Sequence, residues 1–175
     1  MQDVLIVVDM QNDFIDGALG SAEAVAIVPA VKDKLENFSG TVYFTRDTHG
    51  VDYLETQEGR RLPVPHCVRG TDGWQICDAL KSFADASVTV DKPSFGSEEL
   101  CSLLKAQNQK EPIGQITLVG LCTDICVISN AMLIKAALPE VAVTVDAACC
   151  AGVTPESHKN ALSAMQMCQI TVENA

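Results

Sequence analysis

Aromatic residues and positive charge are both scarce in this sequence, and the shortage of positive charge argues against two classes of partner. Phe, Trp and Tyr make up 5% of the 175 residues, and 12 Lys and Arg face 23 Asp and Glu, for a formal net charge of −11 at pH 7. Because no run of Lys or Arg is present, we expect neither nucleic acid nor an anionic lipid surface as a partner. No apolar run approaches the roughly 18 residues that a membrane span needs. The expected partner is therefore a small molecule.

Low-complexity segments, repeats and Gly/Pro/Ser-rich linkers are also absent. A chain of this length, 47% apolar, can bury roughly two-thirds of its unfolded-state surface, so we expect one domain over residues 1–175. Its eight cysteines lie mostly among apolar or small residues, and no signal-peptide pattern precedes the first predicted strand. We therefore expect free thiols and a cytoplasmic location. Whether the protein forms a homo-oligomer is left open.

Short apolar runs alternate with helical patterns along the chain. Residues 4–8 are apolar throughout, as is typical of a central strand covered on both faces. Further strands are predicted at 41–45, 87–91, 115–120, 141–145 and 170–172, and helices at 22–38, at 76–83, from Ser97, from near Cys126 to 138, and from Thr154. The pattern predicts an α/β fold: an open, mostly parallel sheet of five or six strands with helices on both faces, as in Rossmann-like folds. The active site of such a sheet lies at the carboxyl ends of its strands.

Three reactive side chains are predicted to meet at that edge of the sheet. Asp9 ends the first strand, Lys92 ends the third, and Cys126 lies in the first turn of a helix, where the helix dipole favours a thiolate. Asp9 would accept the thiol proton, and Lys92 would stabilise the anion. The structural alternatives are a turn cap for Asp9, a solvated surface lysine and a small buried cysteine. The convergence of Asp9, Lys92 and Cys126 at one edge of the sheet favours a nucleophile set without histidine, and we leave His158 outside it.

The polar segment 46–73 has little periodicity and is longer than compact domains usually leave unstructured, so we interpret it as a functional loop. Asp47 and His49, two residues apart at a strand end, point to the same side of the chain. With Glu58 and His66, two imidazoles and one or two carboxylates could bind a divalent metal such as Zn, Fe or Mn. The alternative is a polar loop whose histidines orient the substrate or cap strand ends.

Five short blocks follow one another along the chain: VVDMQNDF at 7–14, TRDTH at 45–49, PHC at 65–67, KPSF at 92–95 and GLCTDICV at 120–127. Together they resemble the isochorismatase-like cysteine hydrolases, and within that family the nicotinamidase/pyrazinamidase branch. The combination is highly specific and spans essentially the whole chain, although the single blocks are not specific. The resemblance implies an amidohydrolase of that fold with a role in pyridine nucleotide salvage.

The resemblance also implies roles for matching residues. Asp9, Lys92 and Cys126 match the catalytic triad. The backbone N–H groups of Cys122 and Cys126 match an oxyanion hole, and the peptide bond before Cys122 matches a cis peptide of the family. Phe14 matches a residue that stacks on the substrate ring.

Three positions match metal ligands of nicotinamidases, whose metal binds the ring nitrogen of nicotinamide: Asp47, His49 and His66. Many of these enzymes have a third histidine between the last two ligands, and this chain has none there. Glu58 is the best replacement, with Glu55 and Asp52 as competitors. The resemblance thus implies a divalent metal, zinc before iron or manganese.

The expected reaction is the conversion of nicotinamide to nicotinic acid and ammonia through a thioester on Cys126. One alternative is a metal-independent cysteine hydrolase of the same fold that acts on another small amide, ureido or carbamoyl compound. The other is a non-enzymatic thiol or redox sensor, because Cys122 and Cys126 are four residues apart and Cys149 and Cys150 are adjacent. Against the sensor, the spacing differs from Cys-x-x-Cys and a sensor has no need for the acid and the lysine.

Overall fold

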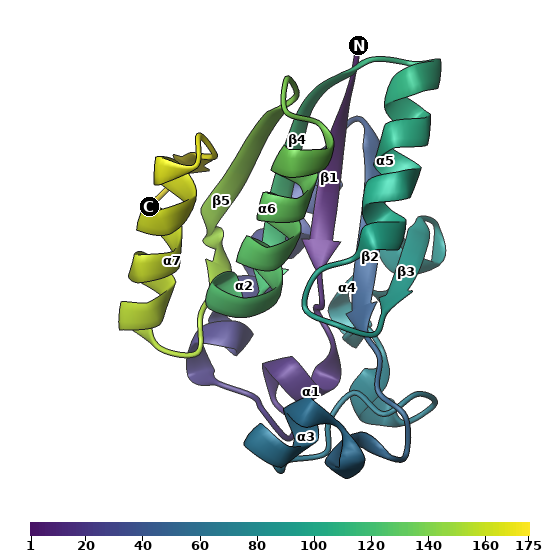
Figure 1. The fold of residues 1–175 in the computed structure, drawn as a ribbon, viewed down its shortest axis with the longest axis vertical. Coiled ribbons are helices and arrows are strands. Elements are labelled where there is room, and N and C mark those ends of the chain that lie inside the picture. The colour runs from purple at the N-terminus through teal and green to yellow at the C-terminus, as the bar shows by residue number, and fades with distance from the viewer.

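One parallel sheet forms the centre of the computed structural model, which describes residues 1–175 (Figure 1). Its strand order is β3-β2-β1-β4-β5-β6, and every neighbouring pair is parallel. The strands are β1 (Gln2–Val8), β2 (Thr41–Asp47), β3 (Val88–Lys92), β4 (Ile113–Leu121), β5 (Ala142–Ala151) and β6 (Thr171–Glu173). The open parallel sheet predicted from the sequence is confirmed, with six strands.

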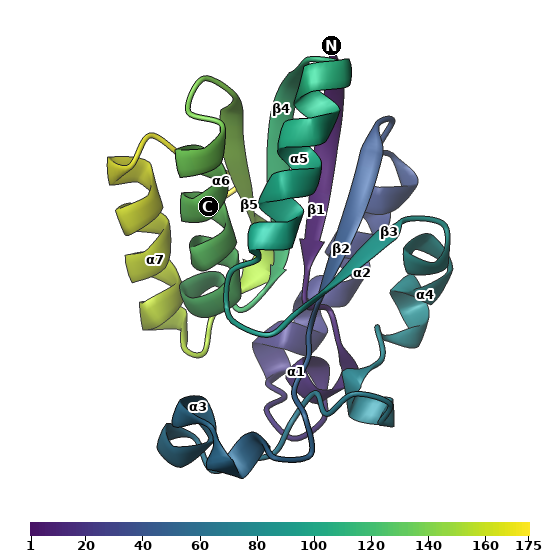
Figure 2. The ribbon, with the colours of Figure 1, turned by 45° about the vertical axis from the view of Figure 1, so that its right-hand side comes forward.

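Helices cover both faces of this sheet (Figures 1 and 2). One face packs against α1 (Asn12–Ile15), α2 (Ala22–Glu36) and α4 (Asp78–Asp85), and the other against α5 (Glu98–Lys110), α6 (Ile128–Ala137) and α7 (Pro155–Met167). Alternate β1 side chains enter the two cores: Val4, Ile6 and Val8 lie in one, and Leu5 and Val7 in the other. Because β1 is buried on both faces, its sequence is apolar without alternation.

The predicted helix starts at Ser97 and Thr154 are present. The Ser97 hydroxyl accepts the N–H of Leu100 at 3.0 Å, and the Thr154 hydroxyl accepts that of Ser157 at 3.0 Å, with Pro155 at the first helical position. Each cap satisfies an N–H group that the helix leaves unpaired. None of the helices is long and apolar enough to span a membrane.

Two segments differ from the sequence prediction. Segment 46–73 is not a continuous loop, because it holds the end of β2, the helix α3 (Gln57–Arg61) and two short 3₁₀ turns. This segment projects beyond the carboxyl ends of the strands (Figure 2). In addition, β5 continues past the predicted end at 145, so Asp146 lies inside that strand, where it pairs with Lys34 of α2 rather than facing the site.

Candidate active site

A cavity of about 550 Å³ opens at the carboxyl ends of the strands, as expected for an open parallel sheet. Its lining includes Cys122 and Cys126, and also Phe14, His66 and Phe95. A further wall comes from the segment around α3: Thr56, Gln57, Glu58, Arg61 and Leu62. Its volume lies in the range of small-molecule sites.

Asp9, Lys92 and Cys126 meet at the inner end of this cavity. The Lys92 Nζ lies 2.6 Å from Asp9 Oδ2 and 3.3 Å from the Cys126 sulfur. The Thr45 hydroxyl donates to the other Asp9 oxygen at 2.6 Å. Asp9 and Lys92 are fully buried and Cys126 is 4% exposed. The ends of β1 and β3 and the turn after β4 thus bring together the three residues that the sequence predicted would converge.

Burial and charge decide which of these groups carry protons. Burial lowers the pKa of Lys92, but the charges of Asp9, Cys126 and Asp47 raise it more, so Lys92 is an ammonium ion. Burial and the nearby Asp9 carboxylate raise the pKa of Cys126 well above its ordinary value, against the opposite effect of Lys92. The pKa of Asp9 is also raised, by burial, although Lys92 opposes the rise. Since a carboxyl group is intrinsically far more acidic than a thiol, we infer that Asp9 is the anion and Cys126 is a thiol.

The position of Cys126 at a helix start therefore does not by itself give a thiolate, because the folded site raises the pKa of the thiol. The dipole acts within the first turn with a modest energy, whereas complete burial disfavours any charge that lacks a partner. The Lys92 ammonium already faces the Asp9 carboxylate at 2.6 Å and the Asp47 carboxylate at 3.6 Å, so a thiolate would add a further anion to the site. The Cys126 sulfur instead accepts a hydrogen bond from the Lys92 Nζ at 3.3 Å.

Cys126 lies on a π-helical turn, Thr123–Val127, that leads into α6. The peptide bond between Leu121 and Cys122 is cis, as the family resemblance implied. Just before it, Gly120 has a φ of +115°, and a Cβ there would lie 2.1 Å from the carbonyl oxygen of Val8. Only glycine fits this position, which places the end of β4 directly against β1.

A second group of side chains lies beside the first. Asp47, His49, Glu58 and His66 each direct one donor atom inward, and these four atoms lie within 4.8 Å of one another. The Asp47 Oδ2 is 2.8 Å from His49 Nε2 and 3.5 Å from His66 Nε2. The Glu58 Oε1 is 3.7 Å and 3.8 Å from the same two nitrogens. The other Asp47 oxygen, Oδ1, lies 3.6 Å from the Lys92 Nζ, so the two groups are adjacent.

These four residues fit a divalent metal ion. The Asp47 Oδ2 is the carboxylate oxygen that lies near both ring nitrogens, and with Glu58 Oε1 it completes four donor atoms that are close enough to bind one ion. The His66 Nδ1 donates to the Val64 carbonyl at 2.8 Å, which turns the Nε2 of the ring toward the other donors. Two imidazoles with carboxylates are a donor set for Zn, Fe or Mn.

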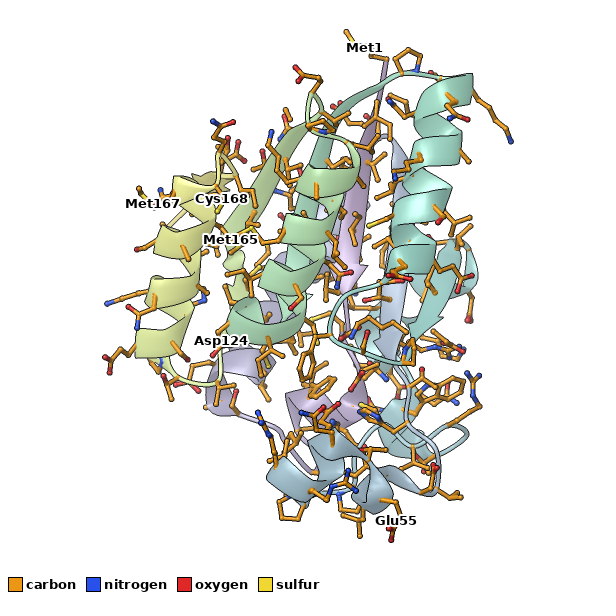
Figure 3. The ribbon with its side chains drawn as sticks, viewed as in Figure 1. Met1, Glu55, Asp124, Met165, Met167 and Cys168 are labelled. Carbon is orange, nitrogen blue, oxygen red and sulfur yellow. The ribbon has the colours of Figure 1, made fainter.

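The ionised state of Asp47 suits this role. Burial raises its pKa, but hydrogen bonds from His49 and His66 lower it further, to well below the ordinary value. Of the three acids considered from the sequence, Glu58 joins the group, whereas Glu55 lies at the outer tip of the molecule (Figure 3) and Asp52 is exposed.

Two residues to which the sequence analysis assigned no role, Gln11 and Tyr53, support this donor group. The Gln11 side chain accepts the Asp47 N–H at 2.7 Å and donates to the Asp47 carbonyl at 2.8 Å, which fixes the backbone at the end of β2. The Tyr53 ring packs against His49 and His66, with ring centroids 4.7 Å and 5.0 Å away. Gln11 and Tyr53 are recognisable only once the strands and the 3₁₀ turn are placed in space.

Phe14 and Trp74 have different positions relative to the cavity. Phe14 lines it, with its ring centroid 5.5 Å from that of His66. Trp74 does not line it. Its indole N–H donates to the Thr48 hydroxyl at 2.9 Å, and the Arg46 guanidinium lies 3.7 Å from its ring centroid. Trp74 thus packs the segment after His66 against the end of β2.

The open parallel sheet, with a cavity and two adjacent groups of buried polar side chains at the carboxyl ends of its strands, is typical of an enzyme that acts on a small molecule. The Isochorismatase domain model matches residues 3–175, and the chain belongs to the isochorismatase family.

Relatives agree with this assignment. Nicotinamidase of Schizosaccharomyces pombe is 29% identical, over 73% of this chain and 74% of that protein. Nicotinamidase/pyrazinamidase of Mycobacterium tuberculosis is 30% identical, over 70% of this chain and 73% of that protein. The crystal structure of pyrazinamidase of Pyrococcus horikoshii in complex with zinc superposes with a TM-score of 0.80 at 25% identity, over 98% of both chains.

Proposed function

We propose that this protein hydrolyses nicotinamide to nicotinic acid and ammonia through a thioester on Cys126. One observation carries the proposal: a buried ammonium, Lys92 Nζ, lies 2.6 Å from the Asp9 carboxylate and 3.3 Å from the Cys126 sulfur at the inner end of the cavity. Relatives named nicotinamidase and pyrazinamidase support the substrate class.

The first step moves one proton and no net charge. Asp9 takes the thiol proton of Cys126, so the negative charge passes from the carboxylate to the sulfur while Lys92 stays within 3.3 Å of it. Because the proton only moves from one buried group to its neighbour, this exchange adds no net charge to the site. The thiolate then attacks the carboxamide carbon.

The tetrahedral intermediate places a negative charge on the former carbonyl oxygen. We assign its stabilisation to the backbone N–H groups of Cys122 and Cys126, each worth about 3 kcal/mol of barrier where such donors have been removed. Asp9 returns its proton to the departing ammonia. Water then enters, Asp9 takes a proton from it, and attack on the thioester releases the acid and restores the Cys126 thiol.

Asp47, His49, Glu58 and His66 would hold a divalent metal ion, with zinc as the first choice. When bound, this ion supplies a Lewis acid for the ring nitrogen of the substrate. Phe14, which lines the cavity beside His66, would pack against the ring. Together these residues orient the carboxamide toward Cys126.

Replacing the nucleophile tests the proposal. Cys126→Ala should abolish ammonia release from nicotinamide, because alanine cannot form the thioester. Cys168→Ala, which changes an exposed free cysteine, should keep wild-type turnover. Mass spectrometry of wild-type protein quenched during turnover should detect a nicotinoyl adduct on Cys126. Ammonia release by Cys126→Ala at the wild-type rate would exclude the scheme.

A further inference from the structure

The π turn that carries Cys126 is attached on its outer side to the beginning of α7. The Thr123 hydroxyl lies 2.8 Å from the His158 Nδ1, within hydrogen-bond distance. The Asp124 carboxylate accepts the N–H of Val153 at 3.1 Å and 3.3 Å. Asp124 lies where the lower ends of α6 and α7 approach each other (Figure 3). One residue of the turn therefore contacts α7 itself, and the next contacts the segment that connects β5 to α7.

His158 is itself held firmly in place. A Cβ on Gly152 would lie 2.9 Å from the Cα and Cβ of His158, so the chain leaving β5 passes directly against this residue. Burial is the main cause that lowers the pKa of His158, with Lys159 adding to it and Asp124 opposing it, so the ring is neutral near pH 7. A neutral ring held at its Cα can act as a fixed hydrogen-bond partner for the fully buried Thr123.

Neither Thr123 nor His158 lines the catalytic cavity, but Thr123 directly follows Cys122, whose N–H is one of the two proposed oxyanion donors. Such donors work only within a narrow range of about 2.7–3.1 Å from the oxyanion. A shift of the reacting groups by about 1 Å can cost a factor of about 10² in rate. The position of Thr123 therefore bears directly on the geometry of the reaction.

We propose that Thr123 and His158 are positioning residues, whose hydrogen bond holds the π turn so that the N–H groups of Cys122 and Cys126 face the oxyanion. This proposal rests on the hydrolase mechanism given above. It assigns a role in the reaction to a histidine that the sequence left outside the nucleophile set, without making it a proton carrier. The hydrogen bond acts on the transition state, because the oxyanion forms only there, and it should leave binding of the ring unaffected.

Matched variants of Thr123 separate this role from simple packing. Thr123→Val keeps the side-chain shape but removes the hydroxyl, and it should lower kcat for nicotinamide about 10- to 100-fold with KM changed less than about threefold. Thr123→Ser keeps the hydroxyl and should stay within about threefold of the wild-type kcat. Thr117→Val, at a buried threonine of β4 that is not part of the site, should leave kcat unchanged.

A double-mutant cycle with His158→Leu tests whether the two residues act through one bond. The double variant should be no slower than the worse single variant, since the bond can be lost only once. Strictly additive losses, wild-type kcat in Thr123→Val, or an equal loss in Thr123→Ser would overturn the proposal.

A second substrate keeps this test independent of nicotinamide. Acylation of Cys126 by 4-nitrophenyl acetate also forms an oxyanion, and it gives a burst of nitrophenolate that Cys126→Ala should lack. Slower bursts in Thr123→Val but not in Thr123→Ser support the positioning role. If the wild-type protein releases no ammonia from nicotinamide, that result refutes only nicotinamide as the substrate and leaves the burst comparison valid. Equal bursts in all three proteins refute the positioning role alone.

Discussion

Replacing Lys92 with methionine tests whether charge balance in the buried site contributes to the stability of the fold. The Lys92 Nζ lies 2.6 Å from Asp9 Oδ2 and 3.6 Å from Asp47 Oδ1, and the side chain is fully buried. Methionine keeps most of the apolar volume but leaves two buried carboxylates without their cation. Removing one partner of a buried pair costs about 3–5 kcal/mol. For a protein of this size that is a Tm lower by about 6–20 °C.

This destabilisation should depend on pH. Burial already raises the pKa of Asp9, and Lys92 opposes that rise, so the variant should have a still higher folded-state pKa. The unfolded value is about 3.9. A carboxyl group with a raised folded pKa favours the folded state at pH values below the unfolded pKa, and this contribution is lost as pH rises through the folded pKa. The variant should therefore be closest to wild type near about pH 4 and fall further below it as the pH rises.

Thermal unfolding followed by circular dichroism, with a chelator present and at about pH 5 and pH 8, measures both effects. The double variant Lys92→Met/Asp9→Asn removes the anion together with the cation and should recover part of the lost Tm. Lys81→Met, which breaks an exposed pair with Asp85, should change Tm by less than about 4 °C. A Lys92→Met protein with wild-type Tm at both pH values, or no recovery with Asp9→Asn, would refute the charge argument.

Three further predictions concern other parts of the molecule. Glu58→Gln should weaken zinc binding at least about tenfold in a competition titration with a chromophoric chelator, because it replaces a charged ligand by a neutral one; unchanged affinity would remove Glu58 from the donor group. Hydrogen bonding to Lys34 is the main cause that lowers the pKa of Asp146 against burial, so the pair stabilises the fold above about pH 4 and this contribution is lost as pH falls through the lowered folded pKa. Asp146→Asn should flatten that part of an acid-unfolding curve, and an unaltered curve would contradict the assignment. Gly120→Ala would place a Cβ 2.1 Å from the Val8 carbonyl oxygen and should destabilise the fold by about 3 kcal/mol or more in urea unfolding; wild-type stability would contradict the close approach of the two strands.

The sequence predicted the parts of the fold that follow from long, regular patterns. The unbroken apolar run of β1 indicated a strand covered on both faces, and the caps at Ser97 and Thr154 marked two helix starts that the structure contains. Since parallel strands end at one edge, residues following different strands could be expected to meet there. The structure places Asp9, Lys92 and Cys126 together at that edge.

Short or spatially remote features could not be predicted in this way. The five residues of α3 are too few for a helical period to emerge, so the segment that carries Glu58 read as a loop. The pairing of Gln11 with the Asp47 backbone joins residues that are adjacent only after β1 and β2 align. A cytoplasmic location and a single domain stay predictions from the sequence, and homo-oligomer formation stays open.

The protonation state of Cys126 depends on the folded environment more than on its place in a helix. The first turn of a helix stabilises a thiolate by a modest energy, and the position of a cysteine in such a turn can be predicted from the sequence. Complete burial beside an existing carboxylate acts in the opposite direction and is the larger effect here. A thiol with a raised pKa can nevertheless become the nucleophile, because Asp9 can take its proton while the total charge next to Lys92 stays the same. Asp9 therefore acts as a proton acceptor that keeps the total charge of the site constant. Lys92 can stabilise either the Asp9 carboxylate or the Cys126 thiolate.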